Sequence, residues 1–252
     1  AQLVVWVGPQ LETFLVKPLE VLGRDGRVIT AADLPGIHHL PAREGGLWAE
    51  HSHEDEHAAE VAHEGEPHRV SDPNSALEPS TALDPHLMLN PENAKVIAHA
   101  VAAALAELDP AGAAIYLAND AALSTRLEAL TVALRTQLAP VRALPYVVFH
   151  DAYQHFEAHF GLQPVGTIVV RPEQEPGARR LTQLREAIRE RGARCVFAEP
   201  QFGSRLVQVV VEGTGARAGT LDPLGAALPA GPGQYEALLQ GLADSLTACL
   251  GR

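Results

Sequence analysis

The stretch "AAIYLANDAALSTRLEALTVALRTQL", residues 113–138, decides the fold. Its leucines recur at spacings of four, three, four and four, which is the period of one face of an α-helix; they are Leu123, Leu127, Leu130, Leu134 and Leu138. A helix of about 26 residues is roughly 39 Å long at 1.5 Å per residue. We therefore predict one long helix that spans the height of two domains and joins them stiffly.

Short apolar runs alternate with helical segments after residue 138. We expect strands in "PYVVFH" (145–150), "PVGTIVV" (164–170), "RCVFAEP" (194–200) and "RAGTLDPLG" (217–225). Strands separated by single helices form a parallel sheet, and such sheets bind ligands beyond the carboxyl ends of their strands. His150, Glu199 and Asp222 follow three of these runs, so we expect them at the ligand-binding edge.

The part of the chain before the long helix also has an α/β pattern. "AQLVVWVG" (1–8) is typical of a buried strand in a parallel sheet. Asn90 and Pro91 have the signature of a helix start, and "LDPHLMLNPEN" (83–93) brings His86 to that start. We predict an α/β fold of two parallel-sheet lobes with a metal site in the cleft between them. The lobes are 1–112 and 139–252, joined by 113–138, and the first lobe is expected to lack its first βα unit.

Charge and cysteine content restrict the function. Thirty-one acidic residues face 19 Lys and Arg, giving a formal charge of −12, and no basic stripe favours a nucleic-acid partner. A cationic ligand fits this charge better. No apolar run approaches the roughly 18–20 residues that cross a bilayer. Cys195 and Cys249 lie too far apart for a CxxC pair; their spacing is compatible with one long-range disulfide or with two buried thiols.

Two histidines and up to two carboxylates from opposite lobes suit Zn²⁺, whereas Mn²⁺ and Fe²⁺ prefer more oxygen ligands. Glu199 could instead orient a ligand through a hydrogen bond, and Asp222 could simply form an Asp-Pro turn. His155 and His159 are expected in packing or surface roles. Their segment "HFEAH" has the wrong order for the HExxH motif of zinc hydrolases.

A second group of histidines lies in "AEHSHEDEHAAEVAHEGEPHR" (49–69), within a polar segment of about 41–80 that we interpret as a mobile surface loop. Its members are His51, His53, His57, His63 and His68. Ordering a flexible loop costs about 1–2 kcal/mol per residue, so its affinity should be below that of a preformed cleft. We expect an auxiliary metal binder; a solvated spacer and the primary site are the alternatives.

Five motifs, in this order, resemble a known family: "LVVWVGPQLETFL", "DPHLMLNPENA", "VFHDAYQHFEAHFGL", "FAEPQF" and "GTLDPLG". The family is that of the zinc-specific solute-binding proteins of bacterial ABC importers, the ZnuA-like branch of the metal-binding cluster A-I. The resemblance covers nearly the whole chain. It implies two α/β lobes joined by one long rigid helix, and a monomeric, non-enzymatic, periplasmic protein. Such a protein delivers Zn²⁺ to an ABC permease, and a periplasmic metallochaperone is a further possible partner.

The resemblance also implies residue roles. His86 and His150 match metal ligands, and manganese-binding relatives tend to carry Glu in place of His150. Asp222 matches an aspartate that ligates metal in some members. In other members this aspartate lies outside the coordination sphere, or water takes its place at the metal. The family's disulfide implies a Cys195–Cys249 bond and an oxidising compartment. A further family histidine precedes the strand that matches "LVVWVGP"; it lies upstream of this sequence, or the site is defective.

A zinc hydrolase is the alternative function. It would use His86 and His150 as ligands and Glu199 as general base, and it would need an open coordination position. For the binding protein we expect only small lobe movements when metal leaves, because one long helix is a stiff hinge.

Overall fold

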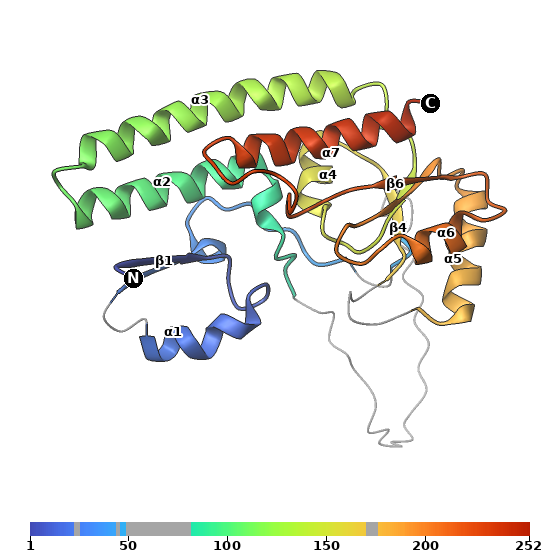
Figure 1. Ribbon diagram of the computed structural model, residues 1–252, viewed down its shortest axis with the longest axis horizontal. Coiled ribbons are helices and arrows are strands. Elements are labelled where there is room, and N and C mark those ends of the chain that lie inside the picture. The colour runs from blue at the N-terminus through green and yellow to red at the C-terminus, as the bar shows by residue number, and fades with distance from the viewer. Residues whose placement is uncertain (23–25, 44–45, 49–81, 170–175) are drawn as a thin grey trace, which may run out of the picture.

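The computed structural model describes residues 1–22, 26–43, 46–48, 82–169 and 176–252. Two α/β lobes lie side by side along one long helix, α3 (Ala113–Leu138), which has the bounds predicted from its leucine spacing (Figure 1). The helix packs on α2 (Pro91–Leu108) of the first lobe and on α7 (Gln234–Leu250) of the second. A single helix therefore contacts both lobes. The expected histidine-rich loop, about 41–80, lies mostly outside the described residues.

The second lobe is built on a parallel sheet in the order β4-β3-β5-β6. All four expected strands are present, as β3 (Tyr146–Val148), β4 (Pro164–Thr167), β5 (Cys195–Ala198) and β6 (Arg217–Thr220). Successive side chains along a strand point to opposite faces. Accordingly, Tyr146 and Val148 pack in one core cluster and Val147 packs in the other, so both faces of the sheet are buried.

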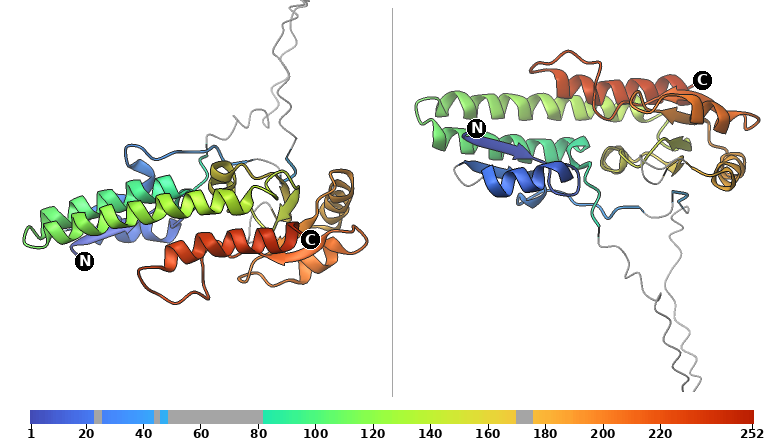
Figure 2. Two further views of the ribbon diagram at one scale, coloured as in Figure 1. Left: turned by 90° about the horizontal axis from the view of Figure 1, so that it is seen from above. Right: turned by 60° about the horizontal axis from the view of Figure 1, so that its bottom comes forward.

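Helices cover both faces of this sheet. The face toward α3 and α7 also holds α4 (Gln154–Phe160), and the opposite face holds α5 (Ala178–Glu190) and α6 (Arg205–Val211) (Figure 2). From β3 the chain proceeds to β4 on one side, while β5 lies on the other side of β3. Connections that diverge in this way leave a ligand crevice at the carboxyl ends of the strands where the order reverses, here β3 and β5.

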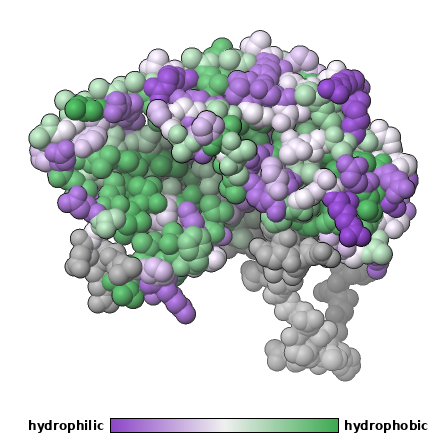
Figure 3. Space-filling model, in the orientation of Figure 1, coloured by the Kyte–Doolittle hydropathy of each residue, from purple (hydrophilic) through white to green (hydrophobic). Residues whose placement is uncertain are grey.

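The first lobe is smaller and contradicts one expectation. Its strands β1 (Leu3–Trp6) and β2 (Arg27–Thr30) pair in parallel, and α1 (Val16–Leu22) lies between them in sequence. The apolar sequence of β1 predicts a buried strand, but its side chains are only partly covered and Val5 is 42% exposed. Among the described residues β1 pairs with β2 alone and α2 packs against it, so apolar side chains remain at the surface of this lobe (Figure 3).

A partly buried charge network connects the segment before residue 49 to the second lobe. The Arg43 guanidinium donates hydrogen bonds to the carboxylate of Asp151 and to that of Glu157 (2.6 Å). The same group lies 3.8 Å from the centre of the Trp48 ring, a cation–π contact. Tyr146 donates its hydroxyl proton to the other Glu157 oxygen at 2.9 Å. Burial raises the pKa of Glu157, and the charge of Arg43 opposes that rise.

Replacing Arg43 should therefore destabilise the fold in a pH-dependent way. A carboxyl with a raised folded pKa stabilises the fold most when protonated and loses that contribution as pH increases through its folded pKa. Without Arg43 the pKa of Glu157 rises further. We expect Arg43→Gln to lower the free energy of unfolding by about 3 kcal/mol at pH 7 and by clearly less at pH 5.

Urea unfolding of the zinc-free chain at both pH values measures this difference. The double variant Arg43→Gln with Glu157→Gln should recover part of the loss at pH 7. An equal loss at pH 5 and pH 7 would contradict the assigned role of Glu157.

Candidate metal centre

His86 lies in the turn that precedes the short helix η4 (Leu87–Leu89) and α2. One carboxylate oxygen of Asp84, Oδ1, accepts hydrogen bonds from the His86 backbone N–H (3.0 Å) and from its ring Nδ1 (2.7 Å). Burial by itself would raise the pKa of Asp84, but the hydrogen bonds and charge of His86 lower it below its ordinary value. Asp84 thus stays ionised and fixes the ring, which leaves Nε2 as the nitrogen that could bind a metal.

His150 follows β3 and is held in the same manner from the neighbouring strand. Glu199 follows β5, its side chain is 1% exposed, and its Oε1 accepts from His150 Nδ1 at 2.6 Å. The same oxygen accepts from the backbone N–H of His150 at 3.3 Å. Phe202, stacked on Phe149, stands edge-on to the His150 ring. His150 therefore also has its Nε2 left to bind a metal, and an aromatic wall lies beside it.

The two imidazoles come from segments far apart in sequence and meet in the structure. Their ring centroids are 5.6 Å apart and the ring planes are inclined by 67°. Two imidazoles on one tetrahedral Zn²⁺, at Zn–N distances of about 2.0–2.1 Å, have centroids about 5 Å apart. The spacing of the two rings is therefore compatible with two imidazoles on one zinc ion. Within the described part of the chain, Asp84 Oδ2 and Glu199 Oε2 are buried without a hydrogen-bond partner.

Asp222 follows β6, as predicted, but its carboxylate serves the adjacent turn. It accepts hydrogen bonds from the backbone N–H groups of Leu224 (3.1 Å) and Ala226 (2.8 Å) and from Gln201 Nε2 (3.0 Å). Burial would raise the pKa of Asp222, but these hydrogen bonds lower it. No three His, Cys, Asp or Glu side chains of the described residues form a group ready to hold a metal. Direct ligation by Asp222 stays a prediction.

The remaining sequence expectations have different outcomes. The Cys195–Cys249 disulfide is present and joins β5 to α7. His155 is buried at 1% exposure, while His159 is partly exposed near Arg135. The histidines of the 49–69 run lie outside the described residues: His51, His53, His57, His63 and His68.

Asp84 is a residue of the candidate site that the sequence reasoning missed. A signal was available, because an Asp whose side chain binds the backbone N–H two residues later is a common turn former, and "DPH" has that spacing. From the sequence, Glu199 could line the cleft, orient a ligand through a hydrogen bond, or be a surface or structural carboxylate. Its hydrogen bond to His150 follows from the neighbouring positions of β3 and β5, and its role toward a metal stays a prediction.

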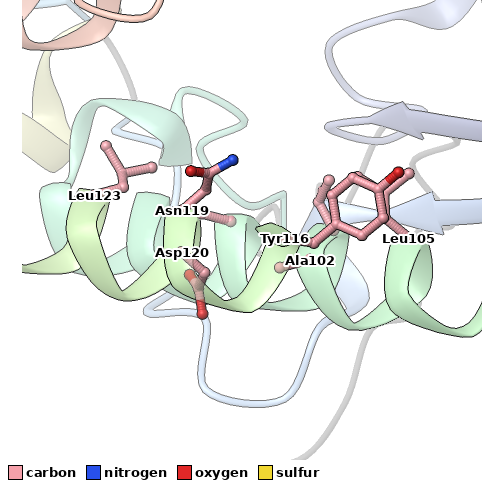
Figure 4. Close-up of a pocket in the computed structure, with 8 residues that line it drawn as sticks. Ala102, Leu105, Tyr116, Asn119, Asp120 and Leu123 are labelled. Atoms are coloured by element: carbon pink, nitrogen blue, oxygen red, sulfur yellow. The ribbon is translucent and has the colours of Figure 1, made fainter. Parts of the chain in front are cut away.

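An apolar pocket between α2 and α3 is separate from this centre. Its labelled lining residues are Ala102, Leu105, Tyr116, Asn119, Asp120 and Leu123 (Figure 4). None of the residues that line it is an imidazole, and its one carboxylate, Asp120, pairs with the exposed His99 at 2.9 Å. In the described ranges, no helix is long and apolar enough to cross a membrane.

Comparison with known proteins gives one consistent family. The family model described as zinc-uptake complex component A, periplasmic, matches residues 1–249. The high-affinity zinc uptake system protein ZnuA of Brucella suis biovar 1 is 46% identical over 259 residues, which cover 100% of this chain and 78% of that protein. The protein of the same description from Yersinia pestis is 36% identical, covering 99% of this chain and 76% of its own length.

Solved structures of this family share the fold. A crystal structure of ZnuA superposes with a TM-score of 0.72 at 26% identity, covering 99% of this chain and 80% of that one. A zinc-bound ZnuA deletion mutant gives a TM-score of 0.73 at 26% identity, with 99% of this chain and 79% of that chain covered.

The role of the orienting carboxylates predicts a graded loss of zinc affinity. Glu199→Gln keeps an oxygen that can accept from His150 Nδ1, whereas Glu199→Leu removes it. We expect the leucine variant to bind Zn²⁺ about 10–100-fold more weakly than the parent, with the glutamine variant between them. Competition with a chromogenic chelator measures the dissociation constants.

Glu128→Gln is the matched control, since that carboxylate pairs with Lys95 at the surface of α3. Equal affinities of the parent and Glu199→Leu would show that Glu199 does not orient a ligand.

Proposed function

This chain belongs to the ZnuA family, the periplasmic component A of zinc-uptake complexes, and from that premise we propose that it captures Zn²⁺ between its lobes with His86 and His150 and delivers the ion to an ABC permease. It is a zinc-binding component of a zinc uptake system. The zinc ion is cargo, so the site must bind it firmly and release it intact.

The main observation behind the proposal is that both imidazoles are hydrogen-bonded to carboxylates in the same way. Each ring donates Nδ1–H to a buried carboxylate, His86 to Asp84 and His150 to Glu199, and keeps Nε2 for the ion. A hydrogen-bonded carboxylate makes the ring a better ligand and removes the cost of orienting it on binding. Two nitrogen ligands favour zinc over manganese. Asp222, ionised at the end of β6, is the carboxylate that we propose as a further ligand.

The hydrolase alternative gains no support from this geometry. Its general base would be Glu199, but that carboxylate is 1% exposed and already accepts two hydrogen bonds from His150. A group held in this way orients a ligand and is poorly placed to take a proton from a water molecule on the ion.

The cellular setting follows from the family and the disulfide. A bond between Cys195 and Cys249 persists in an oxidising compartment such as the periplasm. We place the protein there as a monomer, with a membrane permease as its partner and a periplasmic metallochaperone as a possible donor or acceptor.

The histidine-rich run at 49–69 is proposed as an auxiliary metal binder. Five imidazoles among carboxylates bind divalent ions, but a flexible segment must be ordered to do so, at a cost of about 1–2 kcal/mol per residue. The run would then capture or pass on zinc with lower affinity than the His86–His150 pair.

A competitive zinc titration tests this division of roles. We expect the parent chain and a variant lacking residues 49–69 to keep the same tight site. His150→Ala should weaken it by at least about 100-fold, beyond the usual effect of losing an orienting partner. His99→Ala, which removes an exposed imidazole on α2, should leave the affinity unchanged. Loss of the tight site on deletion, with His150→Ala unaffected, would assign the metal to the histidine-rich run instead.

We also propose that the lobes, 1–112 and 139–252, move little when zinc leaves. The connecting helix α3 packs on both α2 and α7, so wide closure would have to break one of these contacts. Small-angle scattering should give the same radius of gyration for zinc-loaded and zinc-free chains. A clear expansion on zinc removal would contradict a stiff connection.

A further inference from the structure

His155 is a buried histidine that the proposed zinc ligation leaves unused. It lies in the first turn of α4, and only 1% of its surface is exposed. Its Nε2 is 3.3 Å from the backbone carbonyl oxygen of Asp84. Its Nδ1 is buried and has no hydrogen-bond partner among the described residues. A packing residue alone would be better served by an apolar ring, because an unpartnered buried nitrogen costs free energy.

The protonation state of His155 follows from its surroundings. Burial lowers its pKa, although the nearby Asp84 opposes the shift, so the ring is neutral and carries one N–H. A carbonyl oxygen can only accept a hydrogen bond, and therefore the proton lies on Nε2 and is donated to Asp84. This tautomer leaves the lone pair of Nδ1 without a described donor.

The carbonyl that His155 holds belongs to the residue that orients His86. The Asp84 side chain accepts from both the backbone N–H and the ring Nδ1 of His86. Its backbone N–H donates to the carbonyl of Leu40 at 2.9 Å. The orientation of the His86 ring therefore depends on how firmly Asp84 is held in place. The hydrogen bond from His155 fixes the peptide that follows Asp84.

The same short stretch of chain carries the other imidazole. His150 and His155 are five residues apart, and between them the Ala152 N–H donates to the His150 carbonyl at 2.9 Å before α4 begins. One local element thus presents His150 directly and holds the turn of His86 indirectly. Two other side chains, Asn93 and Tyr235, bind carbonyls that come after His86, those of Leu87 and Met88.

We propose that His155 is a positioning residue for zinc capture: by holding the Asp84 carbonyl it fixes His86 relative to His150, so that both imidazoles meet one ion. The inference rests on the proposed function. In this proposal, α4 determines the distance between His86 and His150, which come from different lobes. His155 itself touches no metal in this assignment.

Two substitutions separate the hydrogen bond from the packing. His155→Gln places an amide N–H close to the position of Nε2 and can still donate to Asp84. His155→Phe fills the same space without a donor. We expect zinc affinity to fall about tenfold in His155→Phe, which is the lower end of the range for losing a residue that supports a metal ligand from outside the coordination sphere. In His155→Gln it should return to within about threefold of the parent. His159→Gln, one turn further along α4, is the matched control and should bind as the parent does.

Three further measurements separate a positioning role of His155 from a loss of stability and from failure of the proposed site. Urea unfolding of the zinc-free variants shows whether affinity changes follow stability; a positioning role predicts that His155→Phe loses affinity without a matching loss of stability. The visible spectrum of bound Co²⁺ should change in His155→Phe and be restored in His155→Gln. Zinc binding by His150→Ala in the same series tests the proposed site itself.

The outcomes are distinct. If His150→Ala abolishes tight binding while His155→Phe binds zinc and Co²⁺ as the parent does, the site stands and the positioning role of His155 is refuted. If His155→Gln is as weak as His155→Phe, the donor to Asp84 is not the cause and the proposal also fails. If His150→Ala binds as the parent does, the proposed function is itself wrong.

Discussion

The centre of this molecule depends on two hydrogen bonds between buried carboxylates and imidazoles. A neutral imidazole binds a metal through Nε2 when its proton lies on Nδ1, and a carboxylate acceptor next to Nδ1 favours that tautomer. Asp84 does this for His86 and Glu199 does it for His150. The surrounding fold can be understood from what places those acceptors: adjacent parallel strands for Glu199, and a tight turn ahead of α2 for Asp84.

The charges around the pair favour a cation in the proposed site. Asp84 and Glu199 each leave a buried carboxylate oxygen without a hydrogen bond among the described atoms. A buried carboxylate oxygen without a hydrogen bond costs free energy, and a divalent ion bound to the attached imidazole in the proposed site would reduce that cost. Arg43 does not offset it, because its guanidinium is occupied by Asp151 and Glu157. The overall charge of −12 has the same sign and raises the local concentration of cations.

Regular patterns made most of the fold predictable. The leucine spacing determined α3, and the alternation of strands and helices placed His150 and Glu199 at one edge of the sheet. What could not be predicted depends on side chains that meet from distant segments. The bond from His155 to Asp84 spans 71 residues and the pairing of Arg43 with Asp151 spans 108, and neither leaves a local pattern. The burial of β1 was mispredicted because an apolar run does not reveal how many strands flank it.

The contacts of residues 84–89 bear on how zinc can leave. This segment precedes α3 in sequence and was assigned to the first lobe, yet two of its carbonyls accept hydrogen bonds from the second: Asp84 from His155 and Met88 from Tyr235, at 2.7 Å. Hydrogen bonds also come from residues before α3: Asn93 of α2 donates to the Leu87 carbonyl, and the Asp84 N–H donates to the Leu40 carbonyl. Separating the lobes by moving His86 away from His150 would break the first two of these bonds together. The His86 turn is therefore hydrogen-bonded to both sides of this boundary, which supports the proposal that the lobes move little when zinc leaves.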